Sequence, residues 1–164
     1  MNVRWEAFRI LNRLFQGEQI FLDKQYSSLI KAGGLSAHDR SFLVQLIRGI
    51  VKFYPQLQEM AATYLPKPKN LPQRVQIILY IGLFQLSIDT RIPDYAIVSE
   101  TVELARLTHS HPWIKLINAV LRKASAERTR WHKQAESWGM VLPQWLENYW
   151  ETFLTDGEMN QLKK

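Results

Sequence analysis

The sequence contains no cysteine, which excludes disulfide bridges and metal sites built on thiolates. It also has no long apolar run: the longest, residues 75–88 ("VQIILYIGLFQLSI"), is interrupted by glutamine and is too short to span a bilayer. The first residues, "MNVRWEAFRILNRLF", are amphipathic and lack the apolar core of a secretion signal. We therefore expect a cytoplasmic protein without membrane contact, in which residues 75–88 form a buried helix.

Patterns typical of an active site are also missing. The seven glycines are scattered, without the spacing of a phosphate-binding loop. His109 and His111 have no further ligands at matching spacing, so they are interpreted as loop histidines rather than a metal site. Glu100 and Glu103 are interpreted as part of a solvated helix face rather than as catalytic carboxylates. We therefore expect no catalytic residue, no metal and no bound cofactor in this chain.

The sequence does show helical periodicity along almost its whole length. Trp5, Phe8, Leu11 and Phe15 recur at spacings of three and four, and no alternating pattern of strand length is present. The pair Ser36–Asp39 fits a capping box at the start of a helix. Helices are predicted over residues 4–15, 18–32, 37–53, 55–65, 73–88, 94–107, 112–127 and 142–154. The fold class is therefore predicted to be all-α, with about seven helices in a compact bundle and a helical extension at the C-terminus.

An internal boundary is predicted where the sequence becomes polar and charged, at residues 126–142. It divides the chain into residues 1–126, which form the bundle, and residues 127–164, a linker followed by a last helix. That helix would carry an aromatic face.

The formal net charge of +6 favours an acidic partner, of which nucleic acid is the most common. The basic residues cluster in two stretches, each beside a tryptophan, Trp5 or Trp131, that could stack on a base. We predict RNA contact by the basic residues of both stretches: Arg4, Arg9, Arg13, Arg122, Lys123, Arg128, Arg130 and Lys133. The alternatives are ordinary solvated helix faces and a basic protein without an anionic ligand.

The segment "WIKLINAVLRKA", residues 113–124, places a polar edge beside an apolar stripe. Asn118 lies just outside the stripe, with Arg122 one turn further on. We expect Asn118 to hydrogen-bond a neighbouring helix where the core ends, with direct RNA contact as the alternative. Arg40 occupies a similar edge, and it is expected to pair with Glu100 or Asp39.

An ordered set of motifs resembles the NusB-like helical domain. "INAVLR" at residues 117–122 is similar to its closing motif, and four further pieces occur in the same order. They are Arg4, Ala7 and Leu11; Ser36, Asp39, Arg40, Phe42, Leu43, Leu46, Ile47 and Gly49; Arg74, Ile78, Leu79, Gly82, Gln85 and Leu86; and Ile92, Pro93, Ala96, Glu100, Val102, Leu104 and Ala105. The resemblance covers residues 3–124.

Two branches of this family compete. Free-standing transcription antitermination factors usually close the motif with an acid, whereas the N-terminal domain of Sun/Fmu-type ribosomal RNA cytosine-C5 methyltransferases closes it with arginine, as Arg122 does. The methyltransferase branch also continues with a linker and a helix of the pattern P.WL...W, which Pro143, Trp145, Leu146 and Trp150 resemble. Two departures concern detail: Ser99 replaces a common asparagine, and the usual histidine before Pro143 is absent.

The resemblance to the methyltransferase branch implies an RNA-binding domain that positions 16S rRNA for a catalytic domain absent from this chain. That domain would supply S-adenosylmethionine binding and the cysteine nucleophile, and this chain could pack against it. The alternative is a free-standing NusB-like antitermination or RNA-binding scaffold protein.

Overall fold

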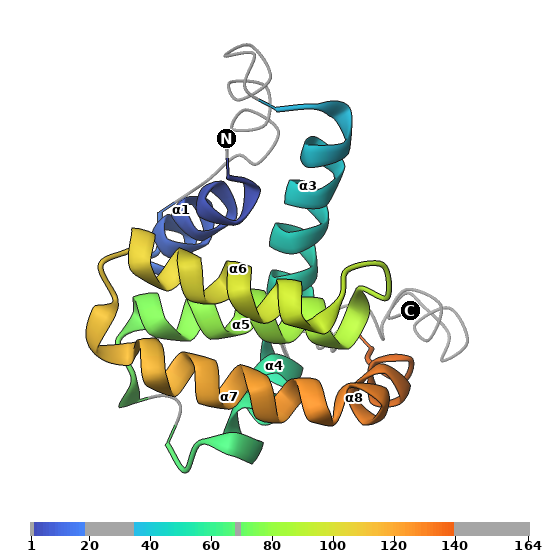
Figure 1. Ribbon diagram of the computed structural model, residues 1–164. Helices are drawn as coiled ribbons and strands as arrows, with labels where there is room; N and C mark the ends of the chain where they lie inside the picture. Colours follow the sequence, from blue (N-terminus) through green and yellow to red (C-terminus); the bar gives the residue numbers. More distant parts are fainter. Residues whose placement is uncertain (1, 19–34, 68–69, 140–164) are drawn as a thin grey trace, which may run out of the picture.

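The computed structural model describes residues 2–18, 35–67 and 70–139, and every regular element in these ranges is a helix. Figure 1 shows the arrangement. The elements are α1 (Val3–Phe15), α3 (Ala37–Lys52), α4 (Tyr54–Tyr64), α5 (Gln73–Ile88), α6 (Asp94–Leu107), the short 3-10 helix η2 (His111–Trp113), α7 (Ile114–Ala126) and α8 (Arg128–Ala135). The predicted all-α fold is therefore confirmed. The helices predicted over residues 18–32 and 142–154 lie outside the described residues.

Helix α5 forms the centre of the bundle because it is apolar on almost every side. Residues 77–87 are all buried, and α5 contacts each of the other described α-helices. In Figure 1 it lies behind α6 and α7, which run side by side across the front. A helix that is hydrophobic all round must be enclosed by others, as the sequence predicts.

Close packing of α5 against α6 and α7 depends on Gly82. A Cβ atom at this position would lie 2.6 Å from Leu121 Cδ2 on α7 and 3.1 Å from Thr101 Cγ2 on α6. The missing side chain thus lets the three helices approach one another. This contact positions α6 and α7 side by side on one face.

Local capping sets several helix ends. The Asn2 side chain accepts hydrogen bonds from the backbone N–H groups of Arg4 and Trp5 at the start of α1. Ser36 and Asp39 form the predicted capping box of α3. After α6, His109 adopts a left-handed conformation with φ 53°, where glycine is the usual residue.

The segment predicted as the start of a polar linker instead contains a helix that packs onto the bundle. Trp131 and Ala135 of α8 are buried, and α8 contacts α5. The i, i+4 spacing of these two residues is the sequence signal for a packed helix, although basic residues surround it. The predicted boundary at residue 126 stays a prediction, but residues 128–135 are continuous with the bundle.

The described residues include no helix long and apolar enough to cross a membrane.

Candidate nucleic-acid interface

The basic residues predicted to contact RNA divide into two that point inward and six whose side chains lie at the surface. On α1, Arg4 points inward and its side chain is 12% exposed. On α8, Arg128 points inward and its side chain is 14% exposed. The outward side chains, distributed over α1, α7 and α8, are those of Arg9, Arg13, Arg122, Lys123, Arg130 and Lys133.

Arg4 connects α1 to the central helix and to α6. Its Nε donates a hydrogen bond to Gln85 Oε1 at 3.0 Å, and its terminal nitrogen lies 3.6 Å from the Glu100 carboxylate. The guanidinium also lies over the Phe42 ring, 5.4 Å from its centroid. Burial lowers the pKa of Arg4, and the nearby Glu100 carboxylate opposes this effect. Its donors thus serve the bundle, and the Arg40–Glu100 pair expected from the sequence is replaced by Arg4–Glu100.

Arg40 itself has no ion pair within residues 2–18, 35–67 and 70–139. The other acid proposed for it, Asp39, is engaged with Ser36, whose Oγ donates to Asp39 Oδ2 at 2.7 Å. This hydrogen bond lowers the pKa of the Asp39 carboxyl group. The structural role expected of Asp39 is thus capping of α3.

Arg9 and Arg13 lie on the outer face of α1 and carry short-range ion pairs. Arg9 lies 3.5 Å from the buried Glu6 carboxylate, and Arg13 lies 2.7 Å from Glu18. Their side chains remain 52% and 43% exposed. The Arg13–Glu18 pair is exposed on both sides and contributes little to stability, whereas Arg9 pairs with a Glu6 carboxylate whose side chain is only 8% exposed. Each guanidinium has further donors at the surface that can meet another anion.

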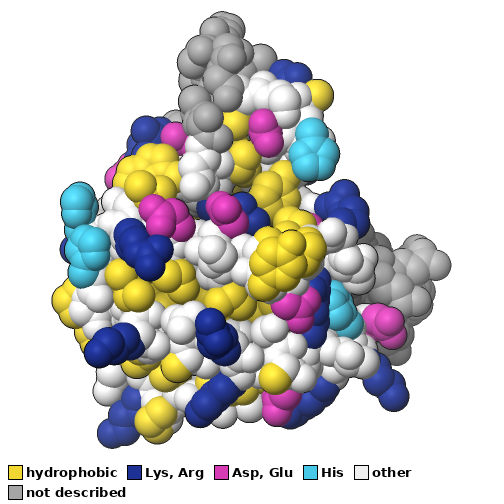
Figure 2. Space-filling model, in the orientation of Figure 1, with side chains coloured by type: hydrophobic (Ala, Val, Ile, Leu, Met, Phe, Trp, Pro, Cys, Tyr) yellow, Lys and Arg dark blue, Asp and Glu magenta, His cyan; other side chains and the backbone are white. Residues whose placement is uncertain are grey.

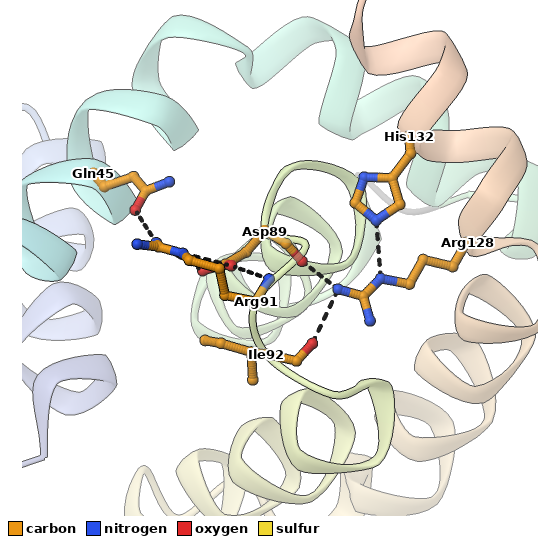
Figure 3. A network of polar contacts seen from close by, with 6 residues as sticks. All are labelled: Gln45, Asp89, Arg91, Ile92, Arg128 and His132. Atoms are coloured by element: carbon orange, nitrogen blue, oxygen red, sulfur yellow. Dashed lines mark hydrogen bonds and ion pairs between the residues drawn. The ribbon is translucent and has the colours of Figure 1, made fainter.

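Arg128 attaches α8 to the loop between α5 and α6 (Figure 3). Its guanidinium donates to the Asp94 carboxylate and to the backbone carbonyl oxygens of Asp89 and Ile92, the last at 3.0 Å. Its Nε donates to His132 Nε2 at 3.0 Å. Burial lowers the pKa of Arg128, and the nearby Asp89 carboxylate opposes this effect. We call this set of contacts the α8 latch: Arg128, Asp89, Ile92, Asp94 and His132.

Arg91 belongs to this loop, and its side chain extends to Gln45 of α3 (Figure 3). Its backbone N–H donates to Asp89 Oδ1 at 2.9 Å, and its guanidinium reaches both Asp89 and Gln45. Burial alone would raise the pKa of Asp89, but the hydrogen bonds from Arg91 outweigh it and lower the pKa. Asp89 thus stays ionised between two arginines, which fixes the loop from which α6 begins.

Trp131 of α8 is unavailable for stacking on a base. Its ring is buried and its Nε1–H donates to the Tyr64 hydroxyl at 2.7 Å. Tyr64 in turn donates to Glu127, and burial together with this bond raises the pKa of Tyr64 to about 12. The interpretation of Trp131 as a stacking residue was therefore wrong. Arg130 covers its outer side, 4.9 Å from the ring centroid.

Among the described residues, the hydrogen bond of Asn118 lies within its own helix rather than to a neighbouring helix, contrary to the expectation from the sequence. Its Oδ1 accepts a hydrogen bond from Arg122 Nε at 3.3 Å, within the same helix. Both side chains face a groove between α6 and α7 rather than the core boundary. The role of the pair is thus to orient Arg122 at this groove.

The α6–α7 groove has a volume of about 700 Å³. Val98 and Val102 of α6 contribute its apolar lining, and Arg106, Asn118 and Arg122 contribute polar groups. Figure 2 shows this face, with hydrophobic side chains between the two helices and Lys and Arg side chains gathered along α7. Of its residues, only Asn118 and Arg122 were singled out from the sequence as candidates.

A second hollow of about 730 Å³ lies between α1, α3 and the α5–α6 loop. Its lining includes Arg4 and Arg91 but also Asp39, Asp89 and Glu100. Because these acids balance the arginines, the hollow offers no excess positive charge to a phosphate backbone. The described residues contain no group of three or more acids and histidines placed to hold a metal ion.

Comparison with known proteins finds one matching family model and several similar proteins. Residues 1–126 match the model of the NusB family. The ribosomal RNA small subunit methyltransferase B of Pseudomonas putida is 37% identical over 129 residues, which cover 77% of this chain and 28% of that protein. The protein of the same name from Shewanella oneidensis is 33% identical over 112 residues, covering 68% and 26%.

A more distant relative shows the same pattern of coverage. The probable ribosomal RNA small subunit methyltransferase B of Bacillus subtilis is 29% identical over 126 residues, which cover 77% of this chain and 28% of that protein. The chain thus spans only about a quarter of the length of these relatives. The matches confirm the resemblance drawn from the motifs.

Proposed function

Because this chain belongs to the NusB family, we propose that it is the RNA-binding N-terminal part of a ribosomal RNA cytosine-C5 methyltransferase. In this proposal it positions small-subunit rRNA, the 16S rRNA of bacteria, for a catalytic domain outside this chain. The names of the relatives support methylation of small-subunit rRNA, and the cytosine-C5 position is what the motif resemblance implies. A role on ribosomal RNA would place the protein in the cytoplasm.

The observation that carries RNA binding is the set of outward basic side chains on α1, α7 and α8. Arg9 and Arg13 on α1, with Lys123 on α7 and Lys133 on α8, hold cationic groups at the surface of a rigid scaffold. The chain as a whole carries a net charge of +6. A phosphate backbone releases counterions when such groups neutralise it, which favours binding without base contacts. RNA bound to these side chains would be held in a defined position, because α5 fixes the spacing of the helices that carry them.

The chemistry of methyl transfer belongs to the proposed catalytic domain. This chain has no cysteine to act as a nucleophile and no glycine-rich loop to hold S-adenosylmethionine. Its own residues can bind and orient RNA. The α8 latch keeps α8 docked on the bundle.

The test is the salt dependence of RNA binding by the full chain. A fluorescent fragment of small-subunit rRNA is titrated with the protein at several salt concentrations between about 50 and 200 mM. We expect the logarithm of the affinity to fall linearly with the logarithm of salt, with a slope of about 0.7 for each phosphate neutralised on a single strand. The double variant Arg9→Gln, Arg13→Gln is expected to lower the slope, with Glu59→Gln as a control on an exposed acid of α4.

An affinity that does not change with salt would contradict the proposal. Capture of transcription-elongation factors by a chain that binds no rRNA would replace it with the antitermination or scaffold role.

A further inference from the structure

Tyr95 is the most exposed large hydrophobic residue within the described part of the chain. Its relative exposure is 78%, whereas the next two, Val51 and Leu107, are 45% and 44% exposed. It lies in the first turn of α6, and it lines the α6–α7 groove. An aromatic ring left in solvent beside a groove is available to stack on a planar partner.

Two arginines accompany Tyr95 along the same groove. Arg106 lies near the other end of α6, and Arg122 lies on α7. Arg122 uses its Nε for Asn118, and Arg106 uses one terminal nitrogen for Glu103 at 2.8 Å. A guanidinium has five N–H donors, so each arginine retains donors that can meet phosphate oxygens.

We propose that the α6–α7 groove binds an unpaired nucleotide segment of the RNA, with a base stacked on Tyr95 and phosphates held by Arg106 and Arg122. This inference rests on the proposed RNA-binding function and names the site where a single strand would be recognised. An aromatic ring beside cationic groups is the combination by which proteins bind single strands. Bases inside a duplex already stack on each other, so the site favours unpaired RNA.

The charges at the groove favour RNA over a protein segment. The carboxylate among its lining residues is Asp94, and this group is engaged by Arg128 and by the Ser125 hydroxyl. The Glu103 carboxylate, which pairs with Arg106, lies at the surface with its side chain 50% exposed. A phosphate can compete for Arg106 because an exposed ion pair of this kind is weak. The groove therefore presents net positive charge to an entering ligand.

The α8 latch supports the site by holding the start of α6, and one of its residues, Asp94, also lines the groove. Arg128 holds Asp94, the residue before Tyr95, and the carbonyl oxygens of Asp89 and Ile92 in the loop that leads into α6. The first turn of α6 is thereby fixed. Tyr95 would thus meet a base with its backbone already ordered, which lowers the entropy cost of binding.

The experiment compares single-stranded and duplex RNA of the same sequence, each about ten nucleotides long, within the range covered by one single-strand site. Affinity is measured by fluorescence anisotropy for the full chain and for Tyr95→Ala, Tyr95→Phe and Arg122→Gln. The matched control is Val51→Ala, which removes an exposed hydrophobic side chain on α3. Thermal unfolding of each variant verifies that the fold is retained.

The expected pattern separates stacking from charge. Tyr95→Ala is expected to weaken single-strand binding roughly 5- to 150-fold, as for the loss of one stacked base, with the salt slope unchanged. Tyr95→Phe retains the ring and is expected to bind as the unaltered chain does. Arg122→Gln is expected to lower the salt slope by about 0.7. Val51→Ala is expected to change nothing.

Several results would overturn the inference. If Tyr95→Ala and Arg122→Gln bind like the unaltered chain while the Arg9, Arg13 variant is weakened, the groove is not the site but the proposed function stands. If Tyr95→Ala abolishes capture of a protein partner and leaves RNA affinity intact, the occupant is a protein. If the unaltered chain shows no salt-dependent RNA binding, the proposed function and this inference both fail.

Discussion

Replacing Arg128 with alanine is expected to loosen the attachment of α8 to the α5–α6 loop and to lower the free energy of unfolding by about 2–3 kcal/mol. The side chain is 14% exposed and donates to the Asp94 carboxylate and the Asp89 and Ile92 carbonyl oxygens. Each of the two carbonyl oxygens loses a charged donor, at a cost of about 1 kcal/mol or more. Asp94 is 38% exposed, so water replaces part of what it loses.

Arg130 provides a matched control on the same helix. It is also an arginine paired with an acid, Glu127, but its side chain is 58% exposed. Arg130→Ala is expected to change the free energy of unfolding by no more than about 1 kcal/mol, as for exposed ion pairs. Arg128→Lys should recover only part of the loss, because a single ammonium group cannot reach all the acceptors of the guanidinium.

The assay is urea-induced unfolding, followed by tryptophan fluorescence and circular dichroism. The two probes should give coincident transitions for the unaltered chain. Hydrogen exchange adds a local measure, since the amides of α8 should lose protection in Arg128→Ala more than those of α5. If Arg128→Ala costs no more than Arg130→Ala, the α8 latch does not stabilise the fold and the reasoning is refuted.

Two further predictions concern the core and the pH dependence. Gly82→Ala is expected to destabilise the fold by about 1–2 kcal/mol in the same urea assay, because the contact of its Cβ with Leu121 outweighs the gain in helix propensity; a more stable variant would contradict the close packing. Burial and the neighbouring Arg128 lower the pKa of His132 below its usual 6.5. Below about pH 6.5 the histidine is protonated in the unfolded chain but stays largely neutral in the folded chain. The folded state should therefore be most stable near pH 7.5 and lose stability as the pH drops below about 6.5. His132→Gln should flatten this change between pH 7.5 and 5.5, and an unchanged profile would count against it.

The helix bounds were largely predictable because local signals set them. The capping box of Ser36 and Asp39 begins α3 as predicted, and residues 73–88 and 94–107 match α5 and α6. The predicted helix over 112–127 is observed as η2 followed by α7, since Pro112 lies in a short 3-10 turn. These features depend on residues close together in the sequence, which periodicity and capping rules describe.

The site was less predictable because it depends on partners far apart in the chain. Arg4 and Arg9 have equal charge and lie on one helix, but only Arg4 meets Gln85, 81 residues away. Arg128 likewise meets Asp94, 34 residues away. No local pattern indicates which arginine points inward. Tyr95 was missed for a related reason, since its exposure beside Arg122 emerges only when α6 and α7 pack together.

Helix α5 has a consequence for how the chain unfolds. It contacts each of the other described α-helices, so the bundle is built around it. Opening α5 would expose the buried faces of its neighbours at once, whereas fraying α8 or the end of α1 would expose much less apolar surface. The amides of α5 should therefore exchange with solvent only through global unfolding. Proteolysis and tolerated insertions should be confined to the connections between helices, and the bundle should behave as one cooperative unit that cannot be divided into smaller folded pieces.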